Sequence, residues 1–178
     1  MSASGSIVRC RGCGALVPTE GIPPEHAYID ASPGCWSLFA ELRGREASDP
    51  GYLAHGCSVT DAYMVQHPGV PGRQSSQSVW VHLVGLQLVV ERGMRPLDAI
   101  DVVRRILVGH PVFPWLDPPP SLGATTVADV AAAGGPDAYA DAVRHWARDA
   151  WQAWAIHHER IRDLATAALA GTAQADPH

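Results

Sequence analysis

The chain contains no lysine and no asparagine, so all 13 of its basic side chains other than histidine are arginines. Without lysine, the protein can have neither a Schiff-base lysine nor the lysine of a phosphate-binding loop. Without asparagine, it cannot have an oxyanion hole that uses an asparagine side chain. These two absences exclude several common kinds of catalytic site, whatever the fold.

The sequence also lacks a concentrated positive charge and a long apolar segment. Its 13 arginines are scattered among 18 acidic residues, whereas phosphate recognition needs a dense basic surface. No stretch reaches about eighteen consecutive apolar residues, and the amino terminus has no apolar run of signal-peptide length. We therefore expect a cytoplasmic protein that binds neither nucleic acid nor membrane. The sequence predicts no particular oligomeric state.

Familiar catalytic motifs are missing as well. We find no G-x-G-x-x-G loop, nucleophile elbow, H-E-x-x-H pair or calcium-binding EF-hand loop. The candidates for chemistry are therefore histidines, one aspartate and the cysteines at positions 10, 13, 35 and 57. In a reducing cytoplasm, these cysteines are expected to be thiols or metal ligands rather than disulfides.

The length and composition predict one mostly α domain. A chain of 178 residues with 47% hydrophobic residues can bury a core without disulfide bonds. We expect a helical bundle of about five helices with an irregular cysteine-containing N-terminal arm. The predicted segments are the arm (1–31), helices (32–108), a proline-rich connector (109–125), a long C-terminal helix (137–170) and a tail (171–178).

Capping residues and helical spacing of apolar residues place the individual helices. Ser32 and Pro33 suit the N-cap and first position of a helix. Pro68-Gly69 ends the second helix, and the third is apolar on nearly all sides, as expected for the central helix of a bundle. The predicted ranges are 32–46, 58 or 60 to 67, 76–92 and 97–108, with one further helical turn at 126–130.

The predicted C-terminal helix has one strongly apolar stripe. At 100° per residue, a single side of this helix carries two tryptophans, a histidine and two aliphatic residues. His158 should therefore face the core more squarely than His157. The residues of the stripe are Trp151, Trp154, His158, Ile161 and Ala165.

Cys10 and Cys13 have the spacing of a metal knuckle, in which two thiolates share one ion and glycines allow the tight turn between them. A structural zinc needs two more ligands, which Cys35, Cys57 or a histidine can supply. The alternative is an exposed turn with two incidental thiols. A thioredoxin-type redox pair fits less well, because that motif opens a helix after a strand.

Cys35 lies in the first turn of a predicted helix, where unpaired backbone amides favour a thiolate. It is a candidate for the third zinc ligand or for a reactive thiol. Its structural alternative is a small buried residue beside Trp36.

Three histidines and one aspartate stand out by their positions. His67 ends a helix against Pro68-Gly69, where it can bind a ligand or interact with the helix dipole. His82 lies in the most apolar helix and His158 follows Trp154, and a buried imidazole needs partners for both nitrogens. Metal ligation would provide them, as would a hydrogen bond from His82 to Ser78 or Asp61. Asp61 alone can equally be a helix cap.

Several motifs together resemble a family of small bacterial proteins of unknown function. They are CxxCG at 10–14, SPGCW at 32–36, His55, DAYxVQHPG at 61–69, SVxVHL at 78–83 and a glutamate-arginine-glycine end at 91–93. This resemblance implies a shared site but no particular reaction. A weaker similarity is to DinB-type helical bundles, which implies one divalent metal held by His67, His82 and His158.

Three hypotheses follow from these residues. The first is a metal-binding helical protein whose zinc site is Cys10, Cys13, Cys35 and His67. In that hypothesis Asp61, His82 and His158 line an adjoining pocket and transfer protons to or from a small-molecule ligand. The second gives the metal, Zn²⁺ or Fe²⁺, to His67, His82 and His158. The third is a non-catalytic adaptor in which zinc only fixes the arm.

Overall fold

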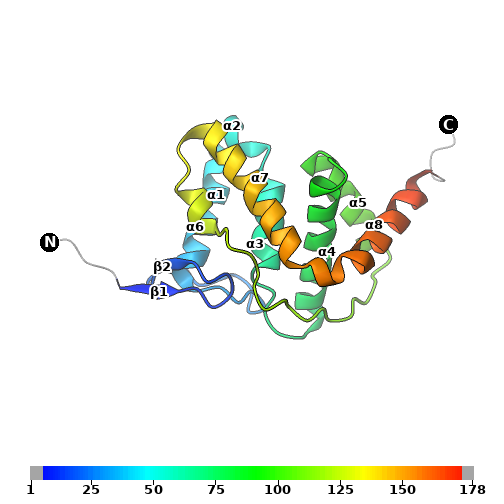
Figure 1. Ribbon diagram of the computed structural model, residues 1–178, viewed down its shortest axis with the longest axis horizontal. Coiled ribbons are helices and arrows are strands. Elements are labelled where there is room, and N and C mark those ends of the chain that lie inside the picture. The colour runs from blue at the N-terminus through cyan, green and yellow to red at the C-terminus, as the bar shows by residue number, and fades with distance from the viewer. Residues whose placement is uncertain (1–5, 174–178) are drawn as a thin grey trace.

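The computed structural model describes residues 6–173 as a helical bundle with a small N-terminal hairpin, as Figure 1 shows. The mostly α prediction is therefore confirmed. Besides one 3₁₀ turn, η1 (Ala155–His157), the described residues contain two strands and eight α-helices: β1 (Ile7–Arg9), β2 (Leu16–Pro18), α1 (Pro33–Ser48), α2 (Pro50–Leu53), α3 (Gly56–Val65), α4 (Arg73–Val90), α5 (Pro96–Val108), α6 (Val127–Ala131), α7 (Gly135–Ala153) and α8 (His158–Ala173).

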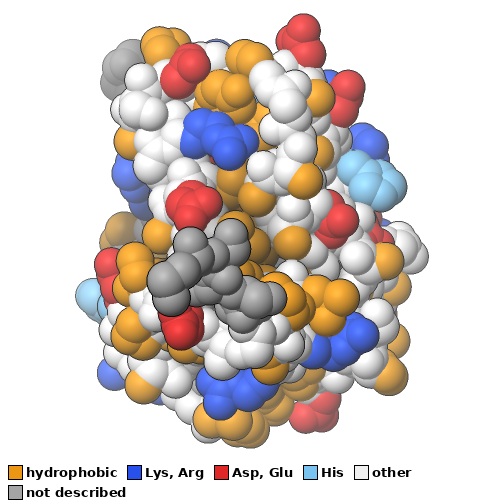
Figure 2. Space-filling model, turned by 90° about the vertical axis from the view of Figure 1, so that its left-hand side faces the viewer, with side chains coloured by type: hydrophobic (Ala, Val, Ile, Leu, Met, Phe, Trp, Pro, Cys, Tyr) orange, Lys and Arg blue, Asp and Glu red, His pale blue; other side chains and the backbone are white. Residues whose placement is uncertain are grey.

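Helix α4 is the central helix, as its apolar sequence predicted. It packs against α3, α5, α7 and α8, so nearly every side of it meets another helix. Its fully buried side chains include Leu83, Leu86 and Leu88. No helix among residues 6–173 combines the length and apolarity that crossing a bilayer requires. On the face drawn in Figure 2, acidic, basic and hydrophobic side chains are interspersed.

The N-terminal arm is more ordered than the sequence indicated. Strands β1 and β2 pair antiparallel, with Val8 opposite Val17. The Cys10 amide donates to the Ala15 carbonyl at 2.7 Å and closes the turn between the strands. Strand β2 packs against α1, with the Val17 side chain fully buried. The arm therefore lies on the bundle through this strand.

The segment 48–51 does more than end the first helix. It ends α1 at Ser48 and also begins the short helix α2, which the sequence did not predict. The Asp49 carboxylate accepts a hydrogen bond from the Gly51 amide at 2.8 Å, and Pro50 occupies the first helical position. An aspartate followed by proline therefore acts here as a helix start as well as a stop.

The prediction of one long helix over 137–170 is wrong. Helix α7 ends at Ala153, and η1 then turns the chain before α8 begins at His158. No proline or glycine marks this break, but two tertiary hydrogen bonds hold it. The Trp154 indole donates to the Val65 carbonyl at 3.2 Å, and His157 Nε2 donates to the Asp117 carbonyl at 2.9 Å. Both helices pack on α4, so the predicted stripe stays buried across the break.

The proline-rich connector is fixed to the bundle by side chains far away in the sequence. The Trp80 indole donates to the Pro114 carbonyl at 2.8 Å. Gln66, which is fully buried, donates through Nε2 to the carbonyls of Leu122 and Thr125. Its Oε1 accepts from the Trp146 indole at 3.0 Å. One glutamine amide therefore joins α3, the connector and α7 with all of these partners satisfied.

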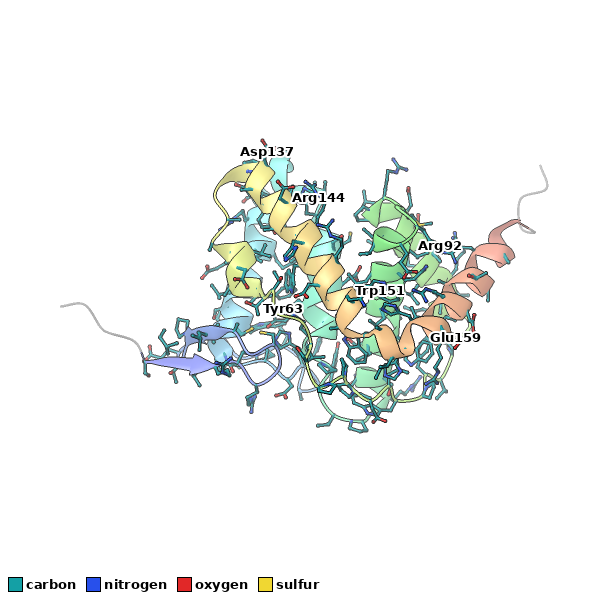
Figure 3. All side chains as sticks on the ribbon, viewed as in Figure 1. Tyr63, Arg92, Asp137, Arg144, Trp151 and Glu159 are labelled. Atoms are coloured by element: carbon teal, nitrogen blue, oxygen red, sulfur yellow. The ribbon has the colours of Figure 1, made fainter. Side chains whose placement is uncertain are left out.

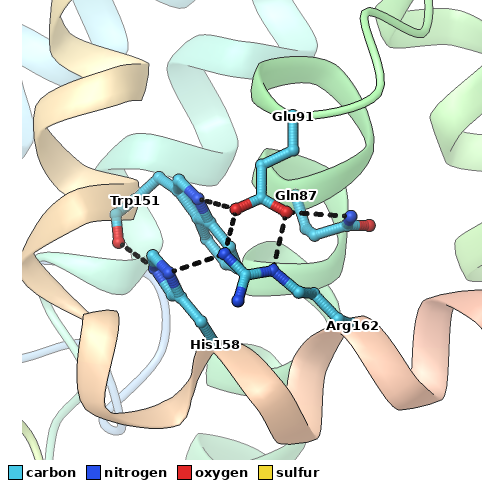
Figure 4. Close-up of polar contacts among 5 residues, drawn as sticks. All are labelled: Gln87, Glu91, Trp151, His158 and Arg162. Atoms are coloured by element: carbon cyan, nitrogen blue, oxygen red, sulfur yellow. Dashed lines mark hydrogen bonds and ion pairs between the residues drawn. The ribbon is translucent and has the colours of Figure 1, made fainter.

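A cluster around Glu91 joins the end of α4 to α7 and α8 (Figure 4). The Glu91 carboxylate accepts from Arg162 Nε at 2.9 Å and from the Trp151 indole at 3.0 Å. His158 stacks on Trp151 with ring centroids 3.7 Å apart. It donates through Nε2 to the Trp151 carbonyl at 2.9 Å, and Nδ1 accepts from Arg162 at 3.4 Å. Both ring nitrogens of His158 thus have protein partners, which indicates a structural role for this residue.

We expect Gln66→Leu to destabilise the protein by about 2–4 kcal/mol. The substitution leaves the Trp146 indole and two connector carbonyls without their partner, and each unsatisfied buried group costs roughly 1–3 kcal/mol. Urea unfolding followed by circular dichroism measures the loss. Gln152→Leu, at an exposed position of α7, is the matched control and should change stability little. Equal stability of the two variants would contradict this role of Gln66.

The Glu91 cluster should also make stability depend on pH. Hydrogen bonds from Arg162 lower the pKa of Glu91 from 4.5 to about 2. Because the folded-state pKa is depressed, this contribution is fully present above about pH 4.5 and is lost as the pH falls towards 2. The difference in urea midpoint between the wild type and Glu91→Gln should therefore shrink across that range. A difference that stays constant from pH 6 to pH 2.5 would show that the carboxylate charge has no such role.

Candidate metal centre

Three segments that are far apart in the sequence meet where the arm lies on the bundle. Cys10 and Cys13 come from the turn after β1, Cys35 from the first turn of α1, and His67 from just beyond α3. Their four ligand atoms all lie within 4.8 Å of one another, and all four residues are buried. The Sγ atoms of Cys13 and Cys35 are 3.7 Å apart, and His67 Nε2 is 3.5 Å from the Sγ atoms of both Cys10 and Cys35.

Glycine allows the cysteine turn to approach this closely. A Cβ atom on Gly12 would lie 2.4 Å from the His67 ring and 2.5 Å from the Asp30 carbonyl oxygen. Gly14 adopts a positive φ of 77°, a conformation that glycine takes without strain. The glycines of the Cys10–Gly14 turn therefore bring the two thiols against His67 from one side.

Ser32 serves the cysteine turn rather than the helix it precedes. It is the N-cap residue of α1, as predicted, but its side chain makes no capping hydrogen bond. Its Oγ instead accepts from the Arg11 amide at 3.4 Å, and its own amide donates to Cys10 Sγ at 3.4 Å. The start of α1 is thus attached to the turn that carries the first two thiols.

His67 is oriented by Tyr63, four residues earlier on α3. His67 Nδ1 donates to the Tyr63 carbonyl at 2.7 Å, which fixes the tautomer and leaves Nε2 facing the sulfurs. The Tyr63 ring stacks on the His67 ring at 4.1 Å, and its hydroxyl donates to Cys35 Sγ at 3.6 Å. In Figure 3, Tyr63 lies where the arm meets the helices. Tyr63 was not among the predicted site residues, although its i, i+4 spacing from His67 is a usable signal.

The four groups strongly perturb one another. Hydrogen bonding among the sulfurs lowers the pKa of Cys10, whereas the same contacts raise the pKa of Cys35. Burial lowers the pKa of His67, but its contacts with Cys10 and Cys13 outweigh burial and raise it to about 9. Without a cation bound among the sulfurs, the three thiols therefore cannot all be negatively charged.

The other predicted site residues do not join this cluster. His82 Nδ1 donates to Asp61 Oδ1 at 2.8 Å, which identifies Asp61 as the partner of His82. Asp61 does not cap α3, because His55 occupies the N-cap position. Cys57 lies in the first turn of α3, away from the other three thiols.

The convergence of His67, His82 and His158 that the second hypothesis requires does not occur. Among residues 6–173, the metal-ligand cluster contains His67 but neither of the other two histidines. His82 pairs with Asp61, and His158 belongs to the Glu91 cluster. Asp61 and His82 line one cavity of about 250 Å³, whose wall does not include His158. A three-histidine metal site of the DinB type is therefore wrong for this structure, because the three imidazoles lie in separate environments.

Comparison with known proteins identifies a family but no activity. No curated protein and no solved structure matches the chain. Residues 8–155 match a family model described as a family of unknown function (DUF5946), and this segment includes all four residues of the cluster. Because the match covers well over half of the 178 residues, the chain belongs to this family of unknown function.

Proposed function

We propose that this protein binds zinc through Cys10, Cys13, Cys35 and His67, and that the zinc fixes the N-terminal arm to the helical bundle. The observation that carries the proposal is the convergence of four buried ligand atoms from three segments. With Zn–S bonds of about 2.3 Å and Zn–N bonds of about 2.0 Å, tetrahedral ligands lie roughly 3.5–3.8 Å apart. The separations of 3.5, 3.5 and 3.7 Å given above match this geometry.

Charge supports a cation at this position. Three thiols within contact distance repel one another when ionised, and a bound divalent ion removes that repulsion. The Ser32 amide and the Tyr63 hydroxyl already donate to the sulfurs, as outer-shell groups of thiolate sites do. Three sulfurs with one imidazole suit zinc, since Cys₃His is one of its common structural ligand sets. Fe²⁺, the other metal that the sequence suggested, is less suited to this closed set.

The ligand count favours a structural role. Catalytic zinc sites keep one position open for water or substrate, whereas structural sites fill all four with protein atoms. Here the chain supplies four donors, and the cavity that contains Asp61 and His82 is lined by none of them. We therefore favour zinc that holds the arm in place, as in the adaptor hypothesis, over zinc that takes part in a reaction.

Purified protein should contain about one zinc per chain. Cys13→Ser should lose most of this metal, because a site with three ligands binds zinc far more weakly. Cys57→Ser is the matched control, since Cys57 lies outside the cluster, and it should keep its zinc, as should His82→Ala. Metal analysis by mass spectrometry measures all four proteins. Wild-type protein that contains no zinc after growth in zinc-rich medium would refute the proposal, as would full occupancy in Cys13→Ser.

Removal of the metal should loosen the arm more than the bundle. We expect a chelator to speed hydrogen exchange at the amides of Cys10, Gly14 and Ser32, which bond within the cluster region. Amides in the middle of α4 should keep their protection. The melting temperature should fall by about 2–4 °C for each kcal/mol of stability lost in a chain of this size. Uniformly faster exchange would instead indicate that the metal supports the whole fold.

A further inference from the structure

A second site lies between α3, α4 and α5, away from the sulfur cluster. It is a cavity of about 250 Å³, slightly below the range of roughly 300–1,000 Å³ typical of drug-sized ligands, so it suits a small molecule. Helix α5 supplies a mainly apolar wall, and the polar groups come from α1, α3, α4 and α5. Its lining includes Arg43, Cys57, Asp61, His82, Ile100 and Arg104.

The hydrogen bond within the aspartate–histidine pair on the cavity wall runs in one direction, from the imidazole to the carboxylate. His82 donates its Nδ1 proton to Asp61 Oδ1 at 2.8 Å, so the neutral imidazole keeps an electron pair on Nε2. Among residues 6–173, Nε2 has no hydrogen-bond partner, and the His82 side chain is 22% exposed. The pair therefore presents one free hydrogen-bond acceptor, and the carboxylate fixes the tautomer and orientation of the ring.

His82 differs in this respect from the other two histidines of the predicted site. His158 uses both ring nitrogens in contacts with Trp151 and Arg162. His67 uses one nitrogen on the Tyr63 carbonyl and directs the other at the sulfurs. His82 combines a carboxylate on one nitrogen with an unpaired second nitrogen beside a cavity, which is the arrangement of a general base.

A glycine on α4 leaves space for the Asp61 carboxylate, and burial of that carboxylate has a desolvation cost. A Cβ atom at Gly85 of α4 would lie 2.4 Å from Asp61 Oδ2, so only glycine lets the carboxylate sit against that helix. The Asp61 side chain is 15% exposed, and burial raises its pKa although the contact with His82 acts in the opposite direction. Two apolar residues would fill this place without a desolvation cost, so packing alone does not account for the pair.

The cavity wall indicates the chemistry of the ligand. Its α5 side is apolar and includes Ile100. Two arginines line the cavity, and each is already paired: Arg43 contacts Glu46, and Arg104 lies 3.2 Å from Asp101. Burial raises the pKa of Cys57, so its thiol is neutral at pH 7. A neutral, mainly apolar molecule fits these surroundings better than an anion, which would meet Asp61.

We propose that this cavity binds a small, neutral, mainly apolar molecule that bears one weakly acidic hydroxyl group, and that the hydroxyl donates to His82 Nε2. In a reaction, the O–H bond would break, the proton would move to Nε2, and the electron pair would remain on the ligand oxygen. Asp61, which does not touch the ligand, is the positioning residue that offsets the imidazolium charge. This site shares no residue with the zinc cluster, so either proposal can fail without the other.

The binding of 4-fluorophenol and 4-fluorotoluene tests this assignment. The two probes are similar in size, both are neutral at pH 7, and only the phenol donates a hydrogen bond. Fluorine NMR titration of wild-type protein should show saturable binding of both, with the phenol bound about three- to tenfold more tightly, as expected for one net hydrogen bond. Addition of the phenol should also shift the Nε2 resonance of His82.

Substitutions of His82 and Asp61 test whether these residues cause the preference for the phenol. His82→Leu should bind both probes with equal affinity, and Asp61→Asn should reduce the preference for the phenol because it weakens Nε2 as an acceptor. His145→Gln, at an exposed position of α7, is the matched control and should behave as the wild type. Thermal melting checks that each variant is folded, and if His82→Leu does not fold, Asp61→Asn decides. Equal affinity of the wild type for both probes, no saturable binding, or an unchanged preference in Asp61→Asn would overturn the proposal.

Discussion

The packing of three sulfur atoms around one imidazole nitrogen constrains the N-terminal half of the molecule. It joins the turn after β1, the first turn of α1 and the end of α3, which occupy distant positions in the chain. Apart from the cluster, the arm is held by its two-stranded hairpin, by a few buried apolar side chains such as Val17 and Ile29, and by a hydrogen bond from the Ile22 amide to Ser37 on α1. Two isolated strands are marginally stable at best. A bound cation at the cluster would therefore contribute to folding directly, since the site exists only when all three segments are in place.

Helix α3 separates the two candidate sites because of helical geometry. Tyr63 and His67 are four residues apart, so they stack on the same side and face the sulfurs. Asp61 is two residues from Tyr63, about 200° around the helix, and its carboxylate meets His82 on α4 instead. One helix thus contributes to a closed, sulfur-rich cluster on one side and to an open cavity on the other. This separation is the physical basis for assigning the two sites different roles.

Polar side chains fix the parts of the fold that apolar packing leaves undefined. Gln66 attaches the proline-rich connector to α3 and α7, and Glu91 attaches α8 to the end of α4. In both cases one polar group bonds several partners at once. A network specifies a single arrangement most strongly when every member is paired, as the side-chain amide of Gln66 is. The contact of Trp154 with the Val65 carbonyl does the same for the break between α7 and α8.

Local patterns in the sequence determined most of the helices, the central place of α4 and the identity of the four cluster residues. Apolar spacing, prolines and glycines act within a few residues, and the CxxCG turn is itself a local feature. The break at Trp154, the roles of Gln66 and Tyr63, and the separation of His67, His82 and His158 were decided by tertiary structure. They depend on hydrogen bonds to partners that are distant in sequence or on the side of a helix that each residue faces, and no local pattern encodes which segments will meet.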